Sequence, residues 1–185
     1  MSVKEKLRTK NRFERSLLSK AHVARLSENL LSQWLKFSKE LPYDSIALYY
    51  PFDNEACTLE IIKYLHSRNK KVLLPVIQNE SNEILFAEYD RREELIKNKF
   101  GILEPKNKEF FNLSDIDMAL IPCVAFNKQL FRLGMGGGFY DRALLEKKSI
   151  ICIGLAYNFQ FEDSSFEEYH DIKMDYIITQ NGILK

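Results

Sequence analysis

The chain has 185 residues, of which 45% are hydrophobic and 29% charged, and its 27 basic residues nearly balance its 26 acidic ones. This length usually forms one domain, and the composition is that of an ordinary globular protein. The near-neutral charge argues against nucleic acid as a partner, and no apolar run is long enough to span a membrane. We expect one domain over residues 1–185, with no obligate protein partner.

The cysteines point to a reducing compartment. Cys57, Cys123 and Cys152 are odd in number and do not have the spacing of metal ligands, which is typical of free thiols. The first six residues, MSVKEK, lead into further charges and not into the apolar stretch of a secretory signal. We therefore expect a cytoplasmic protein.

The N-terminal segment is strongly basic. A helix over about residues 2–18 places four cations within one arc of about 80°. These cations are Lys4, Arg8, Arg12 and Arg15, and the apolar side chains beside the arc are Val3, Leu7 and Leu18. We expect this helix to dock by its apolar edge and to present a stripe of cations beside that edge. A solvated basic face is the alternative, and charge alone favours it.

Helical and strand patterns alternate along the rest of the chain. Leu26, Leu30, Trp34 and Phe37 have helical spacing and predict a core-facing helix. Thr58 is a candidate N-cap for the next helix, and a short helix is expected to begin near Gly138. Strands are predicted at residues 45–50, 71–76, 84–89 (at an edge), 118–124, 150–155 and 176–179. Continuously apolar strands that alternate with helices indicate an α/β fold, with a mainly parallel sheet covered on both faces.

The most informative segment is RLGMGGGFYDR, residues 132–142. Four glycines in five positions leave backbone N–H groups unshielded and permit positive φ angles. Such a loop, leading into a helix, is suited to bind an anion such as phosphate. Arg132 offers a fork of donors for phosphate oxygens, and Asp141 is a ligand for a hard cation. The segment is neither a P-loop nor a dinucleotide fingerprint. A flexible connector is the alternative, but connectors are usually also rich in Ser, Asn or Pro.

Two further segments carry polar residues after a strand or before one. Residues 49–55 (YYPFDNE) place aromatic rings beside a carboxylate, which suits a flat heterocycle with N–H donors. An ordinary strand-end turn explains that segment equally well when it is taken alone. Before the last strand, His170 is a candidate base and Asp171 a candidate cation ligand, but both are also typical of surface turns.

These segments together resemble the 5-formyltetrahydrofolate cyclo-ligase family. The string RLGxGxGxYD is its most specific part. The other matching stretches are residues 4–8, Tyr50 with Glu55, residues 116–117, residues 121–126, residues 154–156 with Gln160, and residues 170–171 and 175–179. The family often has Tyr where this chain has Met135 and Phe139, usually Gly at Cys123 and Asp at Asn127. The glycine loop itself is intact.

The resemblance implies a three-layer α/β/α sandwich and an enzyme that cyclises 5-formyltetrahydrofolate to 5,10-methenyltetrahydrofolate. ATP and Mg²⁺ would be required, and ADP and phosphate released. The γ-phosphoryl group of ATP would pass to the formyl oxygen, and the 10-nitrogen of the iminium phosphate would then displace phosphate. Phosphoryl transfer needs mainly positioning and charge neutralisation. This fits a sequence without a recognisable nucleophile–base arrangement.

Roles follow by position from the same resemblance. The ATP-binding residues are Lys4, Arg8, Arg132, Leu133, Gly134, Met135, Gly136, Gly137, Gly138, Phe139 and Tyr140. The folate-binding residues are Tyr50, Glu55, Met135, Gly136, Gly137, Gly138 and Phe139. Asp141 and Asp171 would hold Mg²⁺, and Arg132 and Asp141 would be catalytic. The small-molecule partners are ATP and 5-formyltetrahydrofolate, with or without a polyglutamate tail.

Two interpretations from other classes remain open. A small nucleotide-binding regulator would share the glycine loop and the basic helix but would have no folate pocket. An RNA-binding module would use the basic helix but would not need a glycine loop flanked by an aspartate. Titration with 5-formyltetrahydrofolate tests the first, and salt-sensitive retention of RNA tests the second.

Overall fold

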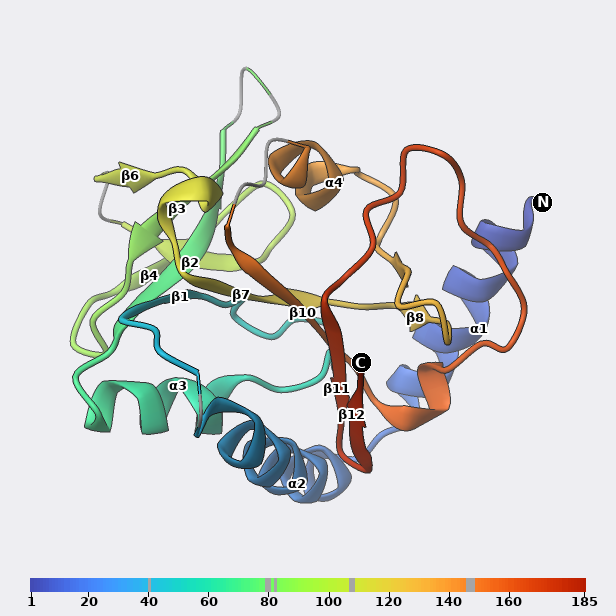
Figure 1. Ribbon diagram of the computed structural model, residues 1–185, viewed down its shortest axis with the longest axis horizontal. Coiled ribbons are helices and arrows are strands. Elements are labelled where there is room, and N and C mark those ends of the chain that lie inside the picture. The colour runs from blue at the N-terminus through green and yellow to red at the C-terminus, as the bar shows by residue number, and fades with distance from the viewer. Residues whose placement is uncertain (40, 79–80, 82, 107–108, 146–148) are drawn as a thin grey trace.

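A large, mainly parallel sheet forms the centre of the molecule (Figure 1). The computed structural model describes residues 1–39, 41–78, 81, 83–106, 109–145 and 149–185. Within these ranges the main sheet contains β1 (Ser45–Ala47), β2 (Lys71–Ile77), β3 (Ile84–Glu88), β6 (Phe110–Phe111), β7 (Met118–Pro122), β10 (Ile151–Leu155), β11 (Tyr176–Thr179) and β12 (Gly182–Leu184). Their order is β12-β11-β10-β7-β1-β2-β3-β6. Neighbours from β11 through β2 run parallel, whereas β12, β3 and β6 pair antiparallel.

Helices cover both faces of this sheet, as the α/β/α expectation requires. On one face lie α2 (Lys20–Ser38) and α3 (Leu59–Ser67), and on the other lie α4 (Phe139–Leu144) and the 3₁₀ turn η1 (Leu113–Asp115) (Figure 1). Each face has its own hydrophobic cluster. Leu30 and Trp34 of α2 are fully buried, so the spacing seen in the sequence does mark the core side of that helix.

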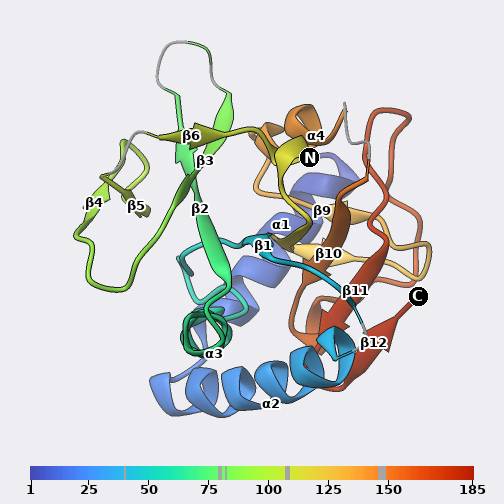
Figure 2. The same cartoon turned by 60° about the vertical axis from the view of Figure 1, so that its left-hand side comes forward.

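The remaining elements flank the sheet. The first helix, α1 (Val3–Ser16), contacts β8 (Ala125–Phe126), which pairs with β9 (Arg132–Leu133) beyond the carboxyl end of β7. A hairpin of β4 (Leu95–Lys97) and β5 (Leu103–Pro105) lies outside the main sheet, next to β2 (Figure 2). The 3₁₀ turn η2 (Asn158–Gln160) follows β10. Two sides of the sheet's carboxyl edge are thus bounded by α1 and by the hairpin.

Local sequence explains where the first two helices begin. The Ser2 hydroxyl accepts a hydrogen bond from the Glu5 N–H, and the Glu5 carboxylate accepts one from the Ser2 N–H. This reciprocal capping box satisfies two N–H groups that the helix leaves without partners. Ser19 caps α2 through a bond from the His22 N–H. Helix α1 therefore starts at Val3, close to the predicted position, and it ends at Ser16.

Helix α1 packs differently from the expectation. Leu7 is buried, but Val3 is exposed, and Leu18 lies beyond the helix end. The rest of the buried side consists of two polar residues, Asn11 and Arg15. The prediction of an apolar docking edge was therefore only partly right, because the buried side also carries polar groups, of which Arg15 pairs with Asp53 in the loop after β1.

Three local predictions differ from the structure. The first strand pairs only as far as Ala47, and the Tyr49 hydroxyl then donates to the Ala56 carbonyl as the chain turns. Thr58 begins α3 without a side-chain cap, because its hydroxyl donates to the Tyr49 carbonyl instead (2.6 Å). The segment near residues 84–89 is not at the edge, since β6 pairs outside β3. Two-residue strands such as β6 carry no periodicity that a sequence could reveal.

In the described part of the chain, no helix combines the length and apolar character that crossing a membrane requires. No disulfide joins the three cysteines, and Cys123 and Cys152 are buried among apolar side chains.

We expect Gly154→Ala to destabilise the fold by about 1–3 kcal/mol, because a methyl group in β10 overfills a packed core. A Cβ there would clash with Ile177 Cδ1 and would lie 2.9 Å from Cys123 Sγ. Gly182→Ala in β12 is the matched control, since no atom lies within 4 Å of its added Cβ. Equilibrium unfolding in urea measures both. Equal midpoints for the two variants would contradict this account of β10.

Candidate active site

One cavity at the carboxyl ends of the parallel strands collects all the predicted site residues. Its volume is about 760 Å³. Lining it are Lys4, Arg8, Tyr50, Glu55, residues 132–141 and Asp171. These residues come from α1, from the loop after β1, from the glycine loop and from the segment before β11. The fold therefore brings together groups that are up to 167 positions apart in the chain, as Lys4 and Asp171 are.

The glycine loop is shaped to receive guanidinium groups, those of Arg8 and Arg132 among them. Gly136 has a φ of +104° and Gly138 a φ of +65°, a backbone region that side chains rarely adopt. A Cβ at Gly134 would lie 2.7 Å from Arg132 Nη1, and one at Gly136 would lie 3.4 Å from Arg8 Cζ. Arg8 Nε also donates to the Gly134 carbonyl (2.9 Å). The absence of side chains at these glycines is thus what lets both cations lie against the loop.

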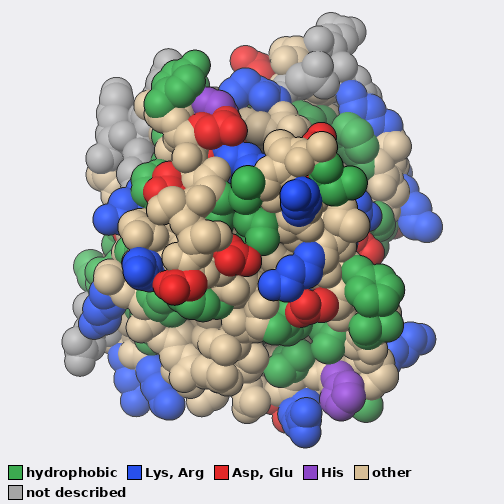
Figure 3. Space-filling view, turned by 90° about the vertical axis from the view of Figure 1, so that its right-hand side faces the viewer, with side chains coloured by type: hydrophobic (Ala, Val, Ile, Leu, Met, Phe, Trp, Pro, Cys, Tyr) green, Lys and Arg blue, Asp and Glu red, His purple; other side chains and the backbone are tan. Residues whose placement is uncertain are grey.

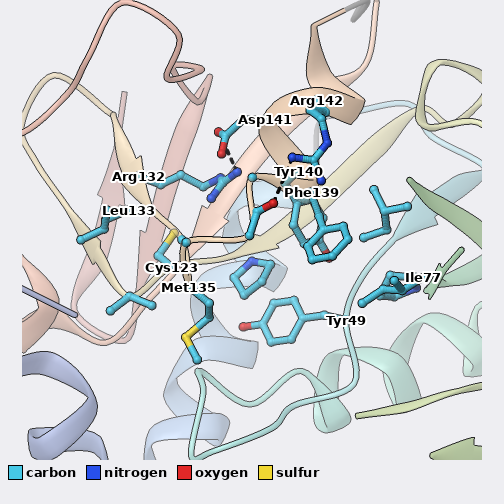
Figure 4. A pocket seen from close by; sticks show the side chains of 18 of the residues that line it. Tyr49, Ile77, Cys123, Arg132, Leu133, Met135, Phe139, Tyr140, Asp141 and Arg142 are labelled. Atoms are coloured by element: carbon cyan, nitrogen blue, oxygen red, sulfur yellow. Dashed lines mark hydrogen bonds and ion pairs between the residues drawn. The ribbon is translucent and has the colours of Figure 1, made fainter. Parts of the chain in front are cut away.

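Two ion pairs join the expected phosphate ligands to the expected metal ligands. Arg132 is buried, and its Nη2 lies 2.9 Å from Asp141 Oδ1, as Figure 4 shows. Lys4 Nζ lies 2.6 Å from Asp171 Oδ2. A second carboxylate, that of Glu168, lies 3.3 Å from the same Nζ. The cavity therefore holds these two cations neutralised in pairs with carboxylates.

The basic arc predicted on α1 is divided between two destinations. Lys4 and Arg8 reach the cavity, whereas Arg12 Nε and Arg15 Nη2 contact Asp53 Oδ2 at 3.1 and 2.9 Å. Arg15 is wholly buried, so neither a solvated face nor a continuous stripe facing an anion describes the arc. On this side of the molecule, acidic side chains lie beside basic ones (Figure 3).

Glu55 is a mostly buried carboxylate that lines the cavity. Its Oε2 accepts a hydrogen bond from the Phe52 N–H (3.1 Å), and Arg15 Nη1 lies 3.9 Å from its Oε1. Burial raises the pKa of Glu55 to about 7, and the nearby guanidinium of Arg15 opposes that rise. This carboxylate therefore changes its charge near neutral pH.

Sequence reasoning missed an apolar wall of the cavity. It is formed by side chains of β2, β3 and the β4–β5 hairpin, with one from the loop after β1, and comprises Phe52, Pro75, Ile77, Ile84, Phe100 and Ile102. The ring of Phe100 lies edge-to-face with that of Phe139, 6.1 Å between centroids. Isolated apolar residues carry no functional signal in a sequence. An aromatic residue in the polar stretch KNKFG was the one available hint.

The buried nucleophilic groups beside the cavity are protonated at neutral pH. Burial raises the pKa of Cys123 to about 12, and it also raises the pKa of Tyr140. Figure 4 shows Arg132 and Asp141 at one side of the cavity and Tyr49 and Met135 at the other. The geometry therefore suits positioning and charge neutralisation more than attack by a thiolate of this chain.

The donor set fits a divalent ion that arrives with phosphate. No group of three or more His, Cys, Asp or Glu residues suited to a metal occurs in the described ranges. Asp141 and Asp171 nevertheless line the same cavity from separate segments. Mg²⁺ commonly binds one or two carboxylates while phosphate oxygens and water complete its shell. His170 also lines the cavity, but it is half-exposed, and its Nε2 lies 3.3 Å from Glu168 Oε2.

The chain matches known proteins over nearly its whole length. The model of the 5-formyltetrahydrofolate cyclo-ligase family matches residues 1–180. The chain is 35% identical over 176 residues to the 5-formyltetrahydrofolate cyclo-ligase of Haemophilus influenzae, a match that covers 92% of this chain and 94% of that protein. The enzyme of the same name from Escherichia coli K12 is 29% identical over 177 residues, which cover 93% and 97% of the two chains.

Two solved structures have the same fold. The 5,10-methenyltetrahydrofolate synthetase of Mycoplasma pneumoniae superposes with a TM-score of 0.80 at 28% identity, covering 96% of this chain and 99% of that one. The synthetase of Aquifex aeolicus superposes with a TM-score of 0.82 at 32% identity, covering 99% and 92%. The sequence match over nearly the whole chain and the shared fold lead to one conclusion: this chain is an enzyme of the 5-formyltetrahydrofolate cyclo-ligase family.

Proposed function

We propose that the protein converts 5-formyltetrahydrofolate to 5,10-methenyltetrahydrofolate with consumption of ATP and a requirement for Mg²⁺. The observation that supports this most is one cavity, which joins a glycine loop holding the guanidinium groups of Arg8 and Arg132 to a carboxylate and an apolar wall. The first part suits a polyphosphate, and the second suits a flat, partly apolar heterocycle with N–H donors. A nucleotide-binding regulator would not need the second part.

The paired charges give the site a way to accept the nucleotide without leaving ions unpaired. Arg132 and Lys4 would bind phosphate oxygens, and Asp141 and Asp171 would bind Mg²⁺. Each cation and each carboxylate would then exchange one partner for another. Such an exchange avoids the cost of a buried charge with no counter-ion. Mg²⁺ bound there would neutralise charge on the phosphate oxygens.

The reaction would proceed in two transfers. The formyl oxygen attacks the γ-phosphorus of ATP, its P–O bond forms as the bond to ADP breaks, and an iminium phosphate results. The 10-nitrogen then bonds to the formyl carbon, phosphate leaves with the former formyl oxygen, and the proton of that nitrogen passes to phosphate. Preorganised donors on Arg132, Arg8 and the glycine loop would stabilise the charge on the transferring group.

The folate would lie with its pterin toward Glu55 and Tyr50. A carboxylate accepts hydrogen bonds from ring N–H groups, and an aromatic ring offers a stacking surface. Met135 and Phe139 line the same cavity, where they provide apolar contact without hydroxyl groups. We further propose that residues 1–185 act as one domain in the cytoplasm, on substrates with or without a polyglutamate tail.

Turnover itself is the first test. Purified protein with ATP, Mg²⁺ and 5-formyltetrahydrofolate is expected to produce the absorbance of the methenyl product. Omission of any one component is expected to abolish that signal, because phosphoryl transfer needs the nucleotide and its charge neutralisation. A folded protein that gives no product with all three components would contradict the proposed function.

Substitutions at the phosphate cations are expected to impair ATP use selectively. Arg8→Ala and Arg132→Lys each remove a charge-assisted or forked contact, which should raise the KM for ATP or lower kcat about ten- to a hundredfold. Lys10→Ala is the control, because Lys10 lies on the same helix with its side chain half-exposed. Steady-state kinetics at saturating folate measures the effect. Unchanged ATP kinetics in Arg8→Ala would place Arg8 outside the nucleotide site.

Glu55→Gln is expected to weaken folate binding and leave ATP binding unchanged. In the wild type, kcat/KM for folate should rise as the pH increases through about 7, because the ionised carboxylate is the better acceptor and its pKa is raised to about 7. The Glu55→Gln variant should lack this limb of the pH profile, because an amide does not titrate. Glu60→Gln, at a partly exposed pair with Lys63, is the control. Loss of ATP affinity in Glu55→Gln would overturn the assignment.

A further inference from the structure

Arg15 is the most deeply buried charge near the cavity, yet nothing in the proposed chemistry uses it. Its side chain has no exposure to solvent. Nη2 lies 2.9 Å from Asp53 Oδ2, and Nη1 lies 3.9 Å from Glu55 Oε1. Nε and Nη1 have no hydrogen-bond partner within the described residues. A wholly buried guanidinium is costly unless carboxylates compensate its charge, so its position beside Glu55 needs an explanation.

The loop that carries Glu55 is held from α1. Asp53 and Asn54 both have a φ of +51°, in the left-handed region that Asn and Asp tolerate better than most residues. Asn54 Nδ2 donates to the Arg15 carbonyl (2.9 Å) and to the Leu18 carbonyl (3.2 Å). The Tyr157 hydroxyl donates to the Glu55 carbonyl (3.0 Å). Main chain and side chain of Arg15 together therefore fix this turn against the helix.

The groups that face Glu55 differ in sign. Arg15 and the more distant Arg12 favour its ionised form, whereas burial and Asp53 disfavour it. Burial raises the pKa of the other phenol and thiol groups that interact with this carboxylate, namely those of Tyr49, Tyr140, Tyr157 and Cys123. These groups are therefore uncharged at pH 7, and Arg15 is the principal positive charge that acts on Glu55.

We propose that Arg15 is a positioning residue for the folate subsite, which keeps Glu55 ionised and aimed into the cavity when the pterin binds. This inference rests on the proposed function. Arg15 does not touch the substrate and acts through Glu55. Because Lys4 and Arg8 stand on the same helix, α1 also sets the separation between the phosphate subsite and the pterin subsite.

The test is the pH dependence of 5-formyltetrahydrofolate binding, measured by calorimetry without ATP or Mg²⁺. Arg15→Gln should move the midpoint of the binding curve upward by about one pH unit, which weakens binding at pH 7 about fivefold and spares it at high pH. Arg15→Lys keeps the charge and should keep the wild-type midpoint. Lys10→Gln is the matched control, since Lys10 lies on the same helix, is half-exposed and faces Glu162 instead of Glu55. Equal weakening of Arg15→Gln at every pH would show a merely structural role and overturn the proposal.

Asp53→Asn tests the same electrostatic effect on Glu55, and it is expected to shift the binding midpoint in the opposite direction. It removes the anion that opposes Glu55 ionisation, so the midpoint should move to lower pH. Because Asn tolerates this backbone region and Asp53 is partly exposed, the variant provides a test even where Arg15→Gln does not fold. An unchanged midpoint would overturn the proposal.

A double-variant cycle distinguishes this inference from the proposed function. In a Glu55→Gln background, Arg15→Gln should have little further effect on folate affinity, because its influence passes through the carboxylate. Additive losses would contradict the proposal. A wild-type protein that neither binds nor converts 5-formyltetrahydrofolate would instead reject the proposed function.

Discussion

The packing of α1 against the carboxyl edge of the sheet is the constraint on which the site depends. This helix buries few apolar groups there, so its attachment relies on charges that find partners on other segments. Lys4 pairs with Asp171, Arg8 contacts the glycine loop, and Arg15 pairs with Asp53. Removing any one partner leaves a charge in a poorly solvated place, which makes these contacts expensive to break singly. The same contacts close one side of the cavity.

This arrangement reconciles stability with ligand binding. A cavity lined by cations alone would be unstable without its anion, whereas paired charges are stable in the free protein. Arg132 and Asp141 lie 2.9 Å apart in such a pair, and both are on or next to the glycine loop. Exchange of partners on the proposed binding of a nucleotide would require little movement of the backbone, because the positive φ of Gly136 and Gly138 already opens the loop. The residues that would bind the nucleotide therefore also hold the site in shape before the nucleotide arrives.

The two halves of the cavity have different physical characters. The glycine loop side is polar and charged, whereas the side formed by β2, β3 and the β4–β5 hairpin is apolar. Glu55 lies within this cavity with its charge poised near neutral pH, because burial and Arg15 act on it in opposite directions. An anionic, phosphate-bearing ligand and a flat, apolar one can accordingly bind side by side without either being placed in the wrong environment.

Local signals in the sequence determined the helices, the parallel strands and the glycine loop. Apolar runs specify buried strands, the serine caps specify helix starts, and a glycine-rich string permits one kind of backbone. The site residues followed from that loop and from the family resemblance, and the structure brings all of them to one cavity. Only the tertiary structure decided that Arg15 is buried beside Glu55 and that Phe100 faces Phe139. These contacts join segments far apart in the chain, and no local pattern encodes which distant partner a charge or a ring will meet.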